Sequence, residues 1–126
     1  MLKKTPLGQV LGLGSAKTGT EQWWHQRVSA IAGIPLVVFL IGYLLSHRGA
    51  SRAEIVASMH NPIVAILMSL TVFTLVWHMR LGLQVVIEDY VHTDHTKYAL
   101  LLLNTFFAVL LVVAALYSIL KMSFGL

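Results

Sequence analysis

An imidazole, a carboxylate and a phenol lie within one long, mostly apolar stretch of the chain, at His78, Asp89 and Tyr90. On an α-helix, Gly82 and Asp89 return to within about 40° and 20° of the direction of His78. A neutral imidazole in an apolar cavity is a ligand that haem iron uses. A tyrosine beside a carboxylate can hydrogen-bond a quinone carbonyl and help to pass protons. The stretch therefore predicts cofactor binding at one end and proton-coupled chemistry at the other.

Each of these residues also has a simpler interpretation. His78 could donate a hydrogen bond to a carbonyl of a neighbouring helix, as polar groups in membrane helices do. Gly82 could leave room for a flat macrocycle one turn along, or only allow close helix packing. Asp89 and Tyr90 could be a helix-end acid and a tyrosine of the aromatic belt. Arg27 could serve membrane orientation, or bind an anionic group such as a haem propionate.

Two further polar features lie near these residues. Arg80 points about 160° away from His78 on the same helix, so it does not share the partner of His78 directly. It could pair with an acid of another subunit or reach a propionate at a groove edge. His92 and His95 stand three apart with Asp94 between them. Two histidines in a polar loop resemble a metal site only weakly, and a solvated loop is the favoured interpretation.

The composition places these residues in a membrane protein. Of 126 residues, 57% are hydrophobic and 11% are charged, and the formal net charge is +4. A soluble domain of this length could not bury so much apolar surface. The chain has no cysteine, which excludes disulfides and thiolate ligation of iron–sulfur clusters. The basic residues are scattered near the ends of apolar segments, a pattern unlike that of a nucleic-acid-binding surface.

We predict an all-α membrane protein with three transmembrane helices, at about residues 28–46, 62–87 and 98–120. Residues 1–27 are expected to form an N-terminal tail and interfacial segment, and residues 28–126 the three-helix domain. Asn61 and Pro62 suit a helix start, as N-cap and first helical residue. Ser51 and Glu54 have capping-box spacing, which predicts a short surface helix between the first two spans.

Basic residues near the spans favour a cytoplasmic N-terminus. Five of them lie on the side of the N-terminal tail and three on the other side. The start of the chain has no continuous apolar core of signal-peptide length. It is also not an Arg- and Ser-rich presequence, so a bacterial inner (cytoplasmic) membrane is favoured over the mitochondrial inner membrane.

The pattern H-x-x-x-G-x-x-x-x-x-x-D-Y from His78 to Tyr90, with three spans and a tail ending in Arg27 and Ser29, resembles a known family. It is similar to the hydrophobic membrane-anchor subunit of succinate dehydrogenase, which is respiratory complex II. The resemblance covers about residues 21–126. The spacing from histidine through glycine to the Asp-Tyr pair is more specific than three spans alone.

The resemblance implies half of a heterodimeric anchor bundle. A second three-helix anchor, of the cytochrome b type, would share one haem b with this chain, each anchor supplying one axial histidine. Flavoprotein and iron–sulfur subunits would carry FAD and the iron–sulfur clusters, oxidise succinate and dock on the inner face. Ubiquinone would be reduced close to the iron–sulfur subunit.

By position, His78 matches the haem ligand, and Arg27 an arginine near the haem propionates. Tyr90 matches the phenol that contacts the quinone, and Asp89 would support it. Arg80 and the His92–His95 segment lie outside the matched pattern. Two alternatives remain open: an anchor of a quinol:fumarate reductase, and a non-redox three-span structural or assembly protein.

Overall fold

The computed structural model describes residues 6–10 and 18–126 of the chain. In this part of the chain the regular elements are helices. They are α1 (Pro6–Val10), α2 (Thr18–Ser46), α3 (Arg52–Met59), α4 (Pro62–Tyr90) and α5 (Asp94–Ser123). Three of them, α2, α4 and α5, are long and apolar enough to cross a membrane, with mean hydropathies of 2.4, 1.9 and 2.7. The predicted all-α architecture with three transmembrane helices is confirmed.

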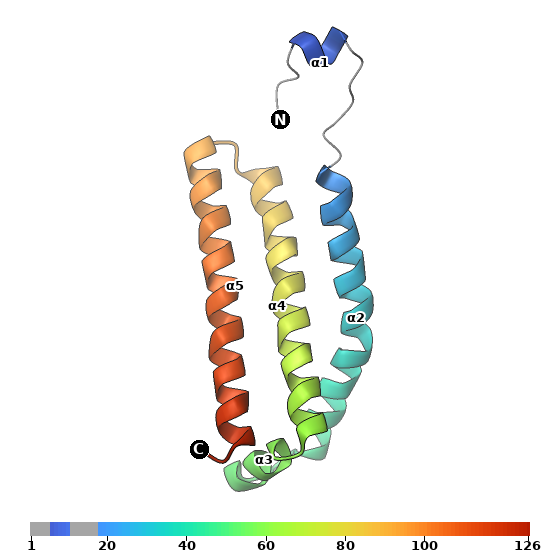
Figure 1. The fold of residues 1–126 in the computed structure, drawn as a ribbon, viewed down its shortest axis with the longest axis vertical. Coiled ribbons are helices and arrows are strands. Elements are labelled where there is room, and N and C mark those ends of the chain that lie inside the picture. Colours follow the sequence, from blue (N-terminus) through green and yellow to red (C-terminus); the bar gives the residue numbers. More distant parts are fainter. Residues whose placement is uncertain (1–5, 11–17) are drawn as a thin grey trace.

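The three long helices form a layer with α4 in the middle (Figure 1). Helix α4 packs against both α2 and α5, whereas α3 lies across the end of the layer and contacts α4 and α5. Between 11% and 17% of each span's most apolar window is buried within the chain. The apolar side chains on both faces of the layer therefore need lipid or another protein to cover them.

Local sequence signals set the helix starts. The Asn61 side chain accepts a hydrogen bond from the Ile63 amide, with Pro62 at the start of α4. Ser51 and Glu54 form the predicted capping box of α3, in which each side chain accepts from the other's backbone amide. Both predicted caps are confirmed. They satisfy amides that the first turn of a helix leaves without partners.

The long helices extend beyond the predicted spans. Helix α2 begins at Thr18 rather than near residue 28, and it continues through Pro35. Helix α4 ends at Tyr90 and α5 begins at Asp94, so residues 91–93 are the whole connector between them. Hydropathy marks the part of a helix that fits the hydrocarbon, whereas a polar helix end still forms its backbone hydrogen bonds in the headgroup region.

Candidate functional site

His78 on α4 is linked to α2 by a hydrogen bond. Its Nδ1 lies 2.9 Å from the Oγ of Ser29, and the Ser29 hydroxyl donates to the Gln26 carbonyl oxygen at 3.0 Å. Ser29 is 8% exposed. A hydroxyl has one proton, so both bonds are satisfied together when Nδ1 of His78 carries a proton and donates to Oγ. That tautomer leaves the lone pair of Nε2 available to an acceptor of electron pairs, such as a metal ion.

His78 also lines an open cavity of about 470 Å³ between α2 and α4. Arg27 lines the same cavity, and its guanidinium lies 5.3 Å from the centre of the Trp23 ring. The structure thus brings together two candidate residues that are 51 positions apart in the sequence. The remaining residues that line the cavity are Gly19, Gln22, Trp23, Gln26, Ala30 and Val85.

Two buried amide atoms at this cavity have no hydrogen-bond partner within the described residues. They are Nε2 of Gln22 and Oε1 of Gln26. Leaving a buried polar atom unpaired costs free energy, roughly 1–3 kcal/mol each. One donor and one acceptor are therefore left unpaired on residues that line the cavity together with Arg27 and His78.

Gly82 lies next to this region, but it is not among the residues that line the cavity. A Cβ added at Gly82 would lie 3.9 Å from Nε2 of Gln26, which is an ordinary van der Waals distance. Close packing between α2 and α4 therefore does not by itself require glycine at this position.

Asp89 and Tyr90 form the end of α4, and both side chains are exposed, Tyr90 to 80%. Adjacent helical residues point about 100° apart, so the two side chains leave the helix in different directions. The helical rise from His78 to Tyr90 is about 18 Å. The chain thus has two separate regions: the cavity at His78, and a polar helix end near one membrane boundary.

Arg80 contacts α5 and not the cavity at His78. Its Nε and Nη2 lie 3.4 Å from Oγ1 of Thr105, and its guanidinium lies 5.4 Å from the centre of the Trp77 ring. The amide of Asn104 donates to the Arg80 carbonyl oxygen at 2.9 Å. Arg80 therefore helps to join α4 and α5.

The His92–His95 segment belongs to no cluster of three or more potential metal ligands in the described part of the chain. The described residues contain no group of three or more His, Cys, Asp or Glu side chains that could hold a metal ion. Asp94 and His95 belong to the first turn of α5, and His92 lies in the connector. An axial ligand of haem iron is a single side chain, so this finding does not bear on His78.

Ser29 is a site residue to which sequence reasoning assigned no role of its own. Its type is common at the start of a membrane helix, and its contact with His78 depends on how α2 and α4 pack. The one feature of the sequence that could have pointed to Ser29 is a hydroxyl two residues after Arg27, at the start of an apolar span. Gln22 and Gln26 were missed for the same reason.

The fold and the site define a three-span membrane subunit with an open, mostly apolar cavity between two spans. Residues 1–115 match the family model of the succinate dehydrogenase/fumarate reductase transmembrane subunit. Because this match covers most of the chain, the chain belongs to that family.

Curated relatives agree with this assignment. The succinate dehydrogenase hydrophobic membrane anchor subunit of Rickettsia bellii is 31% identical over 84% of this chain and 85% of its own length. The subunit of the same name from Paracoccus denitrificans is 29% identical over 96% of this chain and 93% of its own. The succinate dehydrogenase membrane anchor subunit of Reclinomonas americana is 34% identical over 64% and 70%. No solved structure gives a significant match.

Proposed function

We propose that this chain is a membrane-anchor subunit of succinate:ubiquinone oxidoreductase, in which it co-ligates haem b through His78 and contributes Tyr90 to the ubiquinone-reduction site. The observation that carries the proposal is the His78 side chain, hydrogen-bonded through Nδ1 to Ser29 at 2.9 Å, in a cavity that Arg27 also lines. Metal-binding histidines commonly donate their other ring N–H in this way.

The residues at the cavity fit a haem in two respects. His78 can supply a neutral nitrogen ligand, with its tautomer and ring direction held by Ser29. Arg27 offers donors for carboxylates. When bound, haem b accepts and passes on single electrons. The protein orients the imidazole through Ser29, and Trp23, Ala30 and Val85 give the cavity apolar walls.

The end of α4 suits quinone chemistry. Tyr90 is exposed at a membrane boundary, where its hydroxyl can donate to a quinone carbonyl oxygen as negative charge grows there. Asp89 precedes it and can accept or relay a proton from the aqueous side. A tyrosine that only belongs to the aromatic belt would be as exposed as Tyr90, so exposure does not distinguish the two roles. The test must therefore remove the hydroxyl.

The open layer of helices supports the proposal that this chain binds a partner subunit. Both faces of α2, α4 and α5 expose apolar side chains, and the cavity at His78 is open. A second anchor subunit would cover the cavity and supply the other axial histidine. We place the N-terminus and the 91–93 connector on the cytoplasmic side of a bacterial inner membrane, with the iron–sulfur and flavoprotein subunits docked there. FAD, the iron–sulfur clusters and succinate oxidation would belong to those subunits.

The test is purification of the tagged chain from its membrane under mild conditions, followed by identification of the companion chains. We expect three companions, a b-type spectrum on reduction, and electron transfer from succinate to ubiquinone. Reduction of the haem by quinol, with fumarate turnover exceeding succinate oxidation, would assign the chain to a quinol:fumarate reductase instead. A chain that purifies without flavin and haem would contradict the proposal and favour a structural role.

A further inference from the structure

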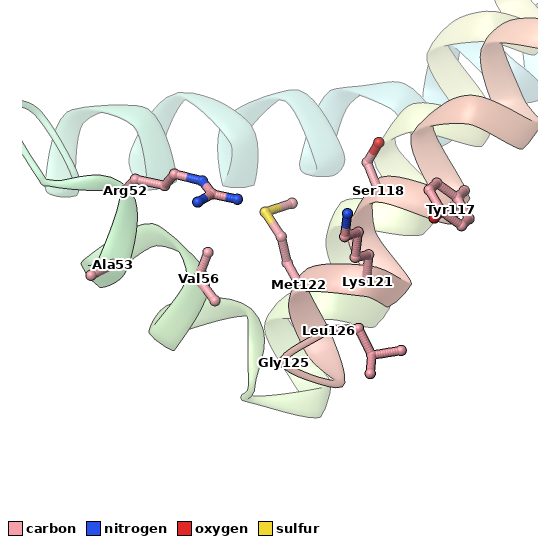
Figure 2. Close-up of a pocket in the computed structure, with 9 residues that line it drawn as sticks. All are labelled: Arg52, Ala53, Val56, Tyr117, Ser118, Lys121, Met122, Gly125 and Leu126. Carbon is pink, nitrogen blue, oxygen red and sulfur yellow. The ribbon is translucent and has the colours of Figure 1, made fainter.

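We propose that the end of the layer remote from Tyr90 holds a binding site for the headgroup of an anionic phospholipid, between α3 and α5. A hollow of about 730 Å³ lies there, and Arg52 of α3 and Lys121 of α5 both line it. Figure 2 shows Arg52 extending from α3 toward Met122 of α5, with Lys121 just before Met122 on the same helix. Two cations from two separate elements therefore face one space.

The charged side chains that line this hollow are both basic, although Leu126, which carries the backbone carboxylate at the end of the given sequence, lines it too. Among the described side chains that line it, none is an aspartate or a glutamate. Glu54 is the acid closest to Arg52 in sequence, but its carboxylate accepts from the Ser51 amide at 2.6 Å and from the Ser51 hydroxyl at 2.9 Å. These bonds hold the carboxylate at Ser51, and Glu54 is not among the residues that line the hollow. The lining thus offers positive charge that side-chain carboxylates do not balance.

The position of the hollow indicates a lipid. Helices of the length of α4 and α5, 29 and 30 residues, are about 43–45 Å long, whereas the hydrocarbon layer is about 30 Å thick. Their ends therefore reach the headgroup layer, where Lys121 and the cross-lying α3 are found. Val56 and Met122 give the same hollow an apolar side, which suits the glycerol and the first carbons of an acyl chain. A free phosphate would leave these apolar side chains unused.

The hollow is held open by contacts at its edges. His60, just after α3, has Nδ1 at 3.0 Å from the Ser123 carbonyl oxygen of α5. Tyr43 of α2 shares a 2.6 Å hydrogen bond with Ser58 of α3. Gly125 closes the side with φ +70°, and a Cβ there would lie 3.3 Å from the His60 ring. These contacts fix α3 against α2 and α5, so the distance between the two cationic positions is set by the fold.

The experiment uses the complex purified with the full-length chain, in detergent. Short-chain phosphatidylglycerol is the anionic probe, and phosphatidylcholine with the same chains is the neutral one. Binding is followed by native mass spectrometry. We expect the Arg52→Gln/Lys121→Gln variant to bind phosphatidylglycerol roughly thirtyfold more weakly, the factor expected for two cations near a membrane surface. Binding of phosphatidylcholine should not change.

Arg48→Gln is the matched control. Arg48 lies just before α3, between α2 and α3, is exposed and does not line the hollow. This variant should bind both lipids as the parent does. A loss in Arg48→Gln equal to that in the double variant would show only general charge attraction and would overturn the proposal. Parental binding in the double variant would overturn it as well.

A second variant keeps both cations and adds an acid to the hollow. Ser118 lines it, and its side chain is exposed, so Ser118→Asp should fold while weakening phosphatidylglycerol binding. If the double variant fails to assemble, Ser118→Asp serves as the test instead. Undiminished binding of phosphatidylglycerol to Ser118→Asp would contradict the proposed lipid site. Inorganic phosphate is the last probe. Competition by phosphate at concentrations equal to the lipid headgroup would show a phosphate site and exclude a lipid occupant.

Discussion

The Nδ1 atom of His78 lies 2.9 Å from the Oγ of Ser29, which joins the middle of α4 to the first span α2. The bond links two residues 49 positions apart and, together with the Ser29–Gln26 bond, favours the imidazole tautomer that has its proton on Nδ1. It makes Ser29 a positioning residue for whatever binds His78 from the cavity. The family assignment and the cavity with Arg27 make that group a haem in our proposal.

Replacement of Ser29 by Ala should weaken haem retention without removing it. The alanine variant keeps the helix but no longer holds Nδ1 of His78, and loss of such an outer contact typically costs roughly 10- to 100-fold in metal affinity. The measurements are the haem content of the assembled complex, followed as the complex is washed, and the midpoint potential of the haem that remains. Ser29→Thr keeps the hydroxyl and serves as the control. Equal haem retention and potential in the alanine variant and the parent would show that the bond only joins helices.

Replacement of Tyr90 by Phe should slow quinone reduction and leave succinate oxidation intact. The ring and its apolar area stay, but one donor to the quinone carbonyl is lost, which costs roughly 2–4 kcal/mol if it acts like an oxyanion-hole group. Activity is measured with ubiquinone and with an artificial acceptor that bypasses the membrane. Tyr98→Phe, at an exposed tyrosine near the same end, is the control. Unchanged ubiquinone activity in Tyr90→Phe, at matched amounts of assembled complex, would make Tyr90 a belt residue.

The membrane orientation can be read by cysteine labelling, because the chain has no native cysteine. Thr93 is exposed in the short connector, and Ala57 is exposed on α3 at the other end of the layer. A Thr93→Cys protein should react with an impermeant reagent only from the cytoplasmic side, and Ala57→Cys only from the periplasmic side. The opposite labelling pattern would reverse the topology that the basic residues predict.

The capping box of α3 should weaken in acid. The Ser51 amide, its hydroxyl and, less strongly, His47 lower the pKa of Glu54 below its ordinary value of 4.5. The stabilisation is therefore complete above 4.5 and is lost as the pH falls through the lower folded value. The protection factors of the α3 amides, which are corrected for the pH dependence of intrinsic exchange, should fall in that range. In Glu54→Gln, which keeps the side-chain acceptor but cannot titrate, the acid dependence should vanish. Persistence of the same dependence there would assign it to another group.

Local patterns in the sequence were enough to predict α3 and the three spans, but not α1 or the first ten residues of α2. The apolar runs predicted three spans, and Asn61 and Ser51 mark the starts of α4 and α3, because a cap depends on residues only two or three apart. The ends of the long helices were not predicted, since polar residues such as Asp94 continue a helix beyond the hydrocarbon.

The candidate site was predicted only in part. Arg27 and His78 line one cavity, as two residues that bind the same group would. Their roles at a haem stay a prediction. The contacts of Ser29 with His78 and of Arg80 with Thr105 depend on which faces of the helices meet. Hydropathy periodicity is weak in helices that are apolar all round, so the sequence does not show those faces.

The most direct test of the account is the spectrum of the assembled complex with His78→Ala. The account predicts that the reduced b-type absorbance is lost or shifted, that the midpoint potential changes, and that added imidazole restores part of the parent signal through the space that the side chain leaves. His92→Ala, in the exposed connector, should match the parent. A His78→Ala complex that assembles with the parent spectrum and midpoint potential would contradict ligation by His78.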